Sequence, residues 1–169
     1  TEFYLVNTGI DTMTGGRIKK IKNLVKNEKF FYLTYGDGLA NINIKKLTDF
    51  HLKQKKLATV TVVKIQIPQE RFGVIYFKKR NIVKSFVEKP NIKNIYINGG
   101  FFVLSPKVIN YIGNNNTRWE AKPLQNIAKK KQLSAFKHNG FWKCMDTARD
   151  KKALENLWKR GNAPWILKN

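Results

Sequence analysis

Two aspartates stand where predicted strands give way to turns. Asp37 lies between two glycines after the apolar stretch 30–35, and Asp146 follows the stretch 141–145. Aromatic and β-branched runs predict buried strands, and open α/β sheets bind ligands outside the carboxyl ends of their strands. Proteins usually hold Mg²⁺ with one or two carboxylates plus substrate phosphates. If both strands belong to one sheet, the two carboxylates can converge on one ion; alternatively, each merely caps the helix that follows.

A second candidate is the polar loop that ends in Thr14-Gly15-Gly16-Arg17. Apolar residues recur with helical spacing directly after it, so we expect a helix over 18–26 with Thr14 as its N-cap. Free N–H groups and the helix dipole at such a start favour an anion. Glycine turns of this kind also occur without a ligand, so both interpretations stay open.

Several kinds of site are not supported by the residues present. His51, His138 and Cys144 share no metal-ligand spacing, and no motif of a serine or cysteine nucleophile is found. The single cysteine excludes an internal disulfide and is typical of a reducing, cytoplasmic setting. No apolar run approaches the ~20 residues of a membrane span. The chain starts inside an expected strand and without Met, so we expect a fragment.

The net charge of +22 comes from 33 Lys and Arg against 11 Asp and Glu. A field of this sign favours polyanions, nucleic acid included. However, only six of the 33 cationic residues are arginine, the residue that makes bidentate contacts to phosphate and guanine. The lysines are spread along the chain among many Asn and Ile, which indicates solvated surface and makes a nucleic-acid-binding module an alternative only.

The hydrophobic pattern predicts one α/β domain over residues 1–169 with a mixed sheet flanked by helices. The order strand, helix, strand over 30–67 predicts parallel pairing of its two strands through a right-handed crossover. Gly99-Gly100, inside a strand, predicts a bulge or a ligand against the backbone. The expected strands are 3–6, 30–35, 58–67, an antiparallel hairpin of 72–77 with 82–87, 96–104, 133–138 and 141–145; the expected helices are 18–26, 42–55, 106–112, 119–131 and 148–159.

Blocks spread over nearly the whole chain resemble the sugar nucleotidyltransferases, and among them the glucose-1-phosphate cytidylyltransferases. EKP, NGGFF and MDTARD followed by APW are specific in combination. The blocks are TGIDTMTGGR (8–17), FYLTYGDGLANINI (31–44), KLATVTVV (56–63), RFGVI (71–75), FVEKP (86–90), INGGFFVLSPKVINYI (97–112), TRWEAKPL (117–124) and GFWKCMDTARDKKALENLWKRGNAPW (140–165).

The resemblance implies a Rossmann-like nucleotide-diphospho-sugar transferase fold whose N-terminal part is missing. It also implies roles for residues. Asp37 and Asp146 would be catalytic and hold Mg²⁺, and Glu88 and Lys89 would bind the sugar hydroxyls and the sugar phosphate, chemistry suited to a carboxylate and an ammonium. The hexose would be lined by Gly73, Asn98 and Gly99, and the nucleotide would be contacted by Thr14, Gly15, Gly16 and Arg17.

The implied reaction joins CTP and α-D-glucose 1-phosphate to CDP-glucose and pyrophosphate in the cytoplasm, in a homo-oligomer, for polysaccharide biosynthesis. Two departures matter. The relatives' glycine-rich phosphate loop is absent, so we expect the isolated chain to bind CTP poorly and to turn over slowly or not at all. Cys144 stands where wider relatives often have Trp, and Trp142 lies further back. The alternatives are a UTP- or dTTP-using relative and a remnant that binds sugar phosphate without catalysis.

Overall fold

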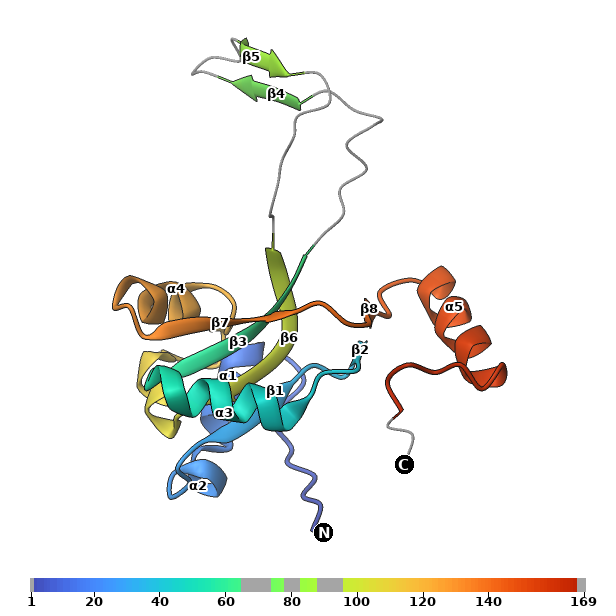
Figure 1. Ribbon diagram of the computed structural model, residues 1–169. Helices are drawn as coiled ribbons and strands as arrows, with labels where there is room; N and C mark the ends of the chain where they lie inside the picture. Colours follow the sequence, from blue (N-terminus) through green and yellow to red (C-terminus); the bar gives the residue numbers. More distant parts are fainter. Residues whose placement is uncertain (1, 65–73, 78–82, 88–95, 167–169) are drawn as a thin grey trace.

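The computed structural model describes residues 2–64, 74–77, 83–87 and 96–166. Its centre is a four-stranded mixed sheet in the order β1-β6-β3-β7 (Figure 1). These strands are β1 (Phe31–Thr34), β3 (Ala58–Lys64), β6 (Tyr96–Leu104) and β7 (Leu133–His138). β6 is antiparallel to both of its neighbours, whereas β3 and β7 are parallel. The mixed sheet therefore agrees with the expectation.

One pairing differs from the prediction. β1 and β3 run in the same direction but do not pair, because β6 lies between them. The bulge expected at Gly99-Gly100 is confirmed by a register shift opposite Thr61, between Val60 and Val62 of β3. Gly100 there has φ +78, which favours glycine. The antiparallel hairpin is also confirmed, as β4 (Val74–Phe77) with β5 (Val83–Val87).

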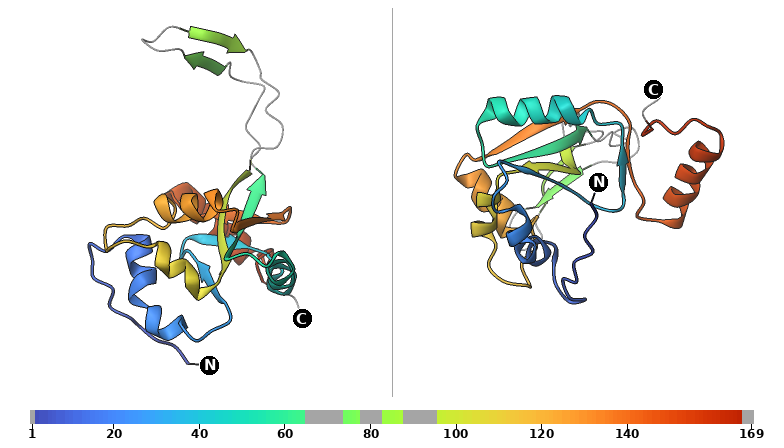
Figure 2. Two further views of the ribbon diagram at one scale, coloured as in Figure 1. Left: turned by 90° about the vertical axis from the view of Figure 1, so that its left-hand side faces the viewer. Right: turned by 90° about the horizontal axis from the view of Figure 1, so that it is seen from below.

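Helices cover both faces of the four-stranded sheet, as the second view of Figure 2 shows. On one face lies α3 (Ile44–Gln54); on the other lie α1 (Thr14–Lys20), the 3₁₀ helix η2 (Pro106–Tyr111) and α4 (Lys122–Lys129). Along β6, Phe102 and Leu104 join the core beneath α1, η2 and α4, while Val103 joins the smaller core beneath α3. This alternation follows from the two-residue period of a strand.

A second small sheet and the last helix lie to the right of this layered body in Figure 1. β2 (Gly38–Ala40) pairs antiparallel with β8 (Trp142–Cys144), and α5 (Ala148–Lys159) follows β8. β2 was not predicted, since three residues of mixed type carry no periodic signal. None of the helices in the described segments has the length and hydropathy needed to cross a membrane.

Several element boundaries also differ from expectation. Residues 3–6 are not a strand; they are exposed, because strand propensity forms no ladder without a partner. The helix expected from 18 begins at Thr14 and is followed by α2 (Lys22–Val25). α3 begins at Ile44 and α4 at Lys122. On α3, His51 is buried against Thr59, with Nδ1 and Oγ1 2.8 Å apart.

Candidate active site at the carboxyl edge of the sheet

The pairing of β2 with β8 brings the two predicted aspartates to one place. Gly38 is opposite Cys144, and the backbone N–H of Met145 donates to the carbonyl oxygen of Asp37 at 2.8 Å. Asp146 is the next residue along the chain. The two acids thus meet at one end of a short antiparallel ladder beyond the carboxyl end of β1, where the fold class favours ligands.

Neither aspartate caps a helix. The N-cap of α3 is Asn43, whose side chain accepts from the N–H of Lys46 at 2.8 Å. The N-cap of α5 is Thr147, which forms a reciprocal capping box with Asp150. Both carboxylates are exposed. The alternative that they serve only as caps is therefore wrong.

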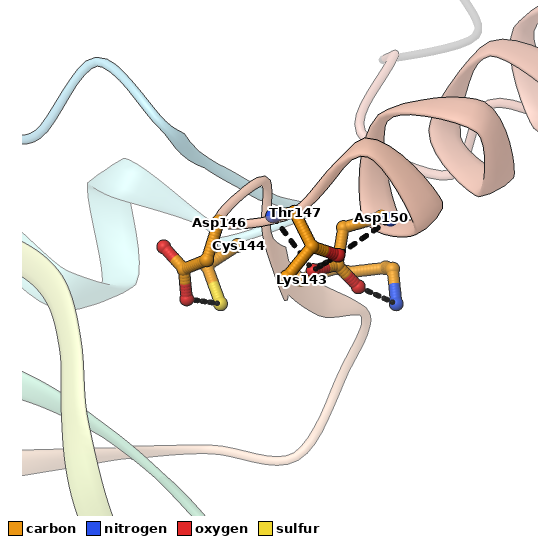
Figure 3. Close-up of polar contacts among 5 residues, drawn as sticks. All are labelled: Lys143, Cys144, Asp146, Thr147 and Asp150. Atoms are coloured by element: carbon orange, nitrogen blue, oxygen red, sulfur yellow. Dashed lines mark hydrogen bonds and ion pairs between the residues drawn. The ribbon is translucent and has the colours of Figure 1, made fainter.

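Asp146 lies between a thiol and a well-anchored helix start, as Figure 3 shows. Its Oδ2 accepts a hydrogen bond from the Cys144 thiol at 2.9 Å, and this bond raises the pKa of that thiol. On the helix side, Asp150 accepts from the Thr147 hydroxyl at 2.7 Å and pairs with Lys143 at 3.0 Å. These contacts lower the pKa of Asp150, the Thr147 bond most. They fix the turn that carries Asp146.

The residues at this ladder fit a hard divalent cation. Carboxylate oxygens are the protein ligands that Mg²⁺ prefers, and Mg²⁺ takes most of its remaining ligands from water and phosphate. In the described part of the chain, no three His, Cys, Asp or Glu gather closely enough to hold a metal by themselves. An ion bound by Asp37 and Asp146 would thus need ligands from its substrates, and the shared ion stays a prediction.

A hydrogen-bond network that the sequence analysis missed joins Thr14 to the β1 edge. The Glu120 carboxylate accepts from the Thr14 hydroxyl at 2.8 Å and from the Tyr35 hydroxyl. Burial chiefly, and then Glu120, raise the pKa of Tyr35 well above its usual range. Nearby, the Oδ1 of Asn98 accepts from the N–H of Gly100 at 2.8 Å, and a Cβ built on Gly100 would lie 2.9 Å from the Cδ2 atom of the Tyr35 ring. Two predicted site residues are therefore connected to Tyr35, Thr14 through the Glu120 carboxylate and Asn98 through its bond to Gly100, against which the Tyr35 ring packs.

The two glycines of the Thr14–Arg17 segment pack against the loop that contains Asn115 and Thr117. The N–H groups of Gly15 and Gly16 donate to the carbonyl oxygen of Thr117 at 2.9 and 3.2 Å. A Cβ on Gly16 would lie 2.5 Å from the Asn115 carbonyl oxygen. The guanidinium group of Arg17 donates a hydrogen bond to the Thr8 hydroxyl. The free N–H groups expected at this helix start are thus engaged by protein, and a nucleotide contact from this segment stays a prediction.

Trp142 connects the small sheet to the bulge of β6. Its indole N–H donates to the carbonyl oxygen of Gly99 at 2.8 Å. Beside it, Lys64, His138 and Trp142 help to line a cleft of about 600 Å³ at the carboxyl ends of β3 and β7. His138 donates from Nε2 to the Phe141 carbonyl oxygen at 3.0 Å. The cleft therefore lies next to Gly99, predicted to line the hexose. Gly73, Glu88 and Lys89 lie outside the described residues.

The chain is similar in sequence to known proteins. Residues 9–150 match the family model described as nucleotidyl transferase. Over 161 residues, 95% of this chain, it is 48% identical to glucose-1-phosphate cytidylyltransferase of Salmonella typhimurium and 41% identical to a protein of Bacillus subtilis named "Probable glucose-1-phosphate cytidylyltransferase". The chain spans 61% of the length of both relatives.

A solved structure of UDP-glucose pyrophosphorylase complexed with UDP-glucose shares the fold. Its TM-score with this chain is 0.67 at 19% identity, and the match covers 94% of this chain and 66% of that one. At that identity the likeness supports the fold alone. The mixed sheet flanked by helices is therefore the nucleotide-diphospho-sugar transferase architecture expected from the sequence.

Proposed function

The chain belongs to the nucleotidyl transferase family, and from this premise we propose that it carries the sugar-phosphate part of a glucose-1-phosphate cytidylyltransferase. The 48% identity to the Salmonella enzyme over 95% of the chain supports this choice within the family. The observation that carries the proposal is the β2–β8 ladder, because it brings Asp37 beside the turn of Asp146 at the carboxyl edge of the sheet.

The proposed reaction is an in-line displacement at phosphorus. A phosphate oxygen of α-D-glucose 1-phosphate forms a bond to the α-phosphorus of CTP. The bond from this phosphorus to the oxygen bridging the β-phosphate breaks, and pyrophosphate leaves with that oxygen. Protein groups contribute mainly position and charge neutralisation in such transfers.

Each site residue has one proposed role. Asp37 and Asp146 would hold Mg²⁺, which when bound neutralises charge on the phosphates. Glu88 and Lys89 would bind the sugar hydroxyls and its phosphate. The Asn98 side chain, held by the Gly100 N–H, would orient the hexose together with Gly73 and Gly99. Contacts to the nucleotide are proposed for Thr14, Gly15, Gly16 and Arg17.

The proposal extends to the setting of the protein. We propose a cytoplasmic enzyme acting as a homo-oligomer, with CDP-glucose supplied to polysaccharide synthesis. Since the chain spans 61% of the relatives' length, the isolated chain should bind glucose 1-phosphate but release pyrophosphate slowly or not at all.

The test measures binding and turnover separately. Glucose 1-phosphate is titrated into the chain with Mg²⁺ by calorimetry, and pyrophosphate release is followed with CTP, UTP or dTTP. We expect binding that Asp37→Asn and Asp146→Asn weaken, while Asp49→Asn, an exposed acid on α3, leaves it unchanged. Absence of glucose 1-phosphate binding would contradict the proposal, and rapid CTP-dependent pyrophosphate release would contradict only the expectation of a weakly active chain.

The second candidate function is binding of sugar phosphate without catalysis, which is supported by the chain spanning 61% of the relative's length. Extending the reading frame upstream of Thr1 distinguishes the two. If the longer chain gains CTP-dependent turnover, this chain is part of a working enzyme. If turnover stays absent while glucose 1-phosphate still binds, the function is binding. Salt-sensitive DNA binding that Glu88→Ala does not affect would instead favour the nucleic-acid-binding alternative.

A further inference from the structure

A second hollow, of about 700 Å³, lies at the amino edge of the sheet. It opens between η2 and α4, which are on the left of Figure 1, whereas β2 and β8 are on the right. Its floor includes Leu57, which directly precedes β3 and accepts from the N–H of Ser105 at 2.8 Å. The polar wall is formed by Lys107, Asn110, Tyr111, Asn126, Lys129 and Lys130. We call this cavity the basic hollow.

The basic hollow is cationic and contains no compensating acid. No Asp or Glu is among its lining residues. Within residues 2–64, 74–77, 83–87 and 96–166, the ion pairs are Lys143–Asp150 and Lys151–Glu155, both remote from it. The Lys130 ammonium lies 5.2 Å from the centre of the Tyr111 ring, a cation–π distance that holds this charge at the aromatic wall.

The lysines at the end of α4 are not needed to satisfy that helix end. The N–H groups of Lys130, Lys131 and Gln132 donate to the carbonyl oxygens of Asn126, Ala128 and Ile127 at 3.0, 2.8 and 2.9 Å. Lys131 adopts φ 56 to make this closure. The carbonyl groups of Asn126, Ile127 and Ala128 thus have backbone partners, and the ammonium groups of Lys129 and Lys130 remain available for a ligand.

We propose that the basic hollow binds an oligophosphate, an anion with two or more phosphate groups. Three ammonium groups and two amide side chains supply donors for charge-assisted hydrogen bonds. A cavity of about 700 Å³ has room for several phosphate groups. An inorganic oligophosphate and a nucleoside triphosphate share this chemistry. The inference does not depend on the proposed function, because the hollow is at the opposite edge of the sheet from Asp37 and Asp146.

The test compares two triple variants that lose the same charge. One is Lys107→Gln/Lys129→Gln/Lys130→Gln in the basic hollow; the control is Lys45→Gln/Lys53→Gln/Lys152→Gln, three exposed lysines of α3 and α5. Inorganic tripolyphosphate is titrated into each by calorimetry at low salt. We expect tripolyphosphate to bind about tenfold more weakly, or weaker still, to the hollow variant only, because this variant loses charge-assisted contacts. Equal losses, or no binding by the parent chain, would overturn the proposal.

A footprint on the unaltered chain keeps the result independent of variant folding. Lysines are acetylated with and without tripolyphosphate and read by mass spectrometry. Protection confined to Lys107, Lys129 and Lys130 supports the site. Equal protection of all lysines overturns it, because non-specific attraction to a chain of net charge +22 would then explain the binding. ATP without metal is the second probe. If ATP and tripolyphosphate bind with equal affinity, the phosphates alone account for binding. If ATP binds more tightly and the hollow variant loses this gain, the hollow also contacts the base.

Discussion

The backbone N–H of Met145 hydrogen-bonds the carbonyl oxygen of Asp37 at 2.8 Å, which joins two segments more than one hundred residues apart. This single ladder bond extends the pairing of β2 with β8 to the two predicted metal ligands. Because both carboxylates are exposed and free of capping duties, they are available to a ligand at little cost to the fold.

Asp37→Asn and Asp146→Asn should each abolish tight divalent-metal binding in the presence of glucose 1-phosphate. Removing one of two anionic oxygen ligands leaves an ion held mainly by water and phosphate. Mn²⁺ is the probe, since it broadens nearby NMR signals: broadening at residues 37 and 146 should disappear in both variants. The free energy of unfolding should change by about 0.5 kcal/mol or less, as for other exposed sites. Unchanged broadening would exclude these carboxylates as ligands.

Gly16→Ala should destabilise the chain by about 1–3 kcal/mol, the usual cost of overpacking. The new methyl group would lie 2.5 Å from the Asn115 carbonyl oxygen, a backbone atom that cannot turn aside. Urea unfolding measures the effect. Gly36→Ala is the matched control, since nothing lies within 4 Å of its Cβ position. Similar midpoints for the two variants would show that the loop of Asn115 yields freely.

Stability should fall as the pH drops below about 6.5, the pKa of an unperturbed histidine. Burial lowers the pKa of His51 in the folded chain, so the unfolded chain takes up its proton first and is favoured by acid. The loss begins at the unfolded pKa and is complete at the lower folded pKa. Urea midpoints at a series of pH values measure it. His51→Gln should flatten the dependence of the urea midpoint on pH below about 6.5. An unchanged slope would show that other groups cause this dependence.

Tyr35→Phe should cost about 0.5–1.5 kcal/mol of stability, the usual net contribution of one hydrogen bond, because Glu120 loses a hydroxyl donor. It should also raise the hydrogen-exchange rate of the Gly100 amide, because the bond to Glu120 holds the Tyr35 ring, which packs against Gly100. Tyr32→Phe is the control, since Tyr32 bonds Thr48 at 2.6 Å on α3 instead. If exchange at Gly100 is the same in both variants, the Tyr35 hydroxyl does not hold the ring against Gly100.

Features that depend on neighbouring residues in the chain are predictable from the sequence. Period-two and period-3.6 patterns located most strands and helices. The glycine pair 99–100 predicted the bulge, because a residue in a bulge often has a positive φ, which glycine adopts easily. The residues Asp37 and Asp146 were also found locally, since an acid between glycines or before a helix is visible in a short window.

The contacts between segments distant in the chain are visible only in the folded structure. Periodicity does not encode partners, so β6 between β1 and β3, and the β2–β8 ladder, could not be read from either strand alone. The same holds for Glu120, which reaches Tyr35 across 85 residues. Glu120 lies in the block TRWEAKPL, which resembles the family, but a carboxylate there gives no local sign of its partner. Long-range contacts are set by packing of whole layers, and the site at the carboxyl edge follows from that packing.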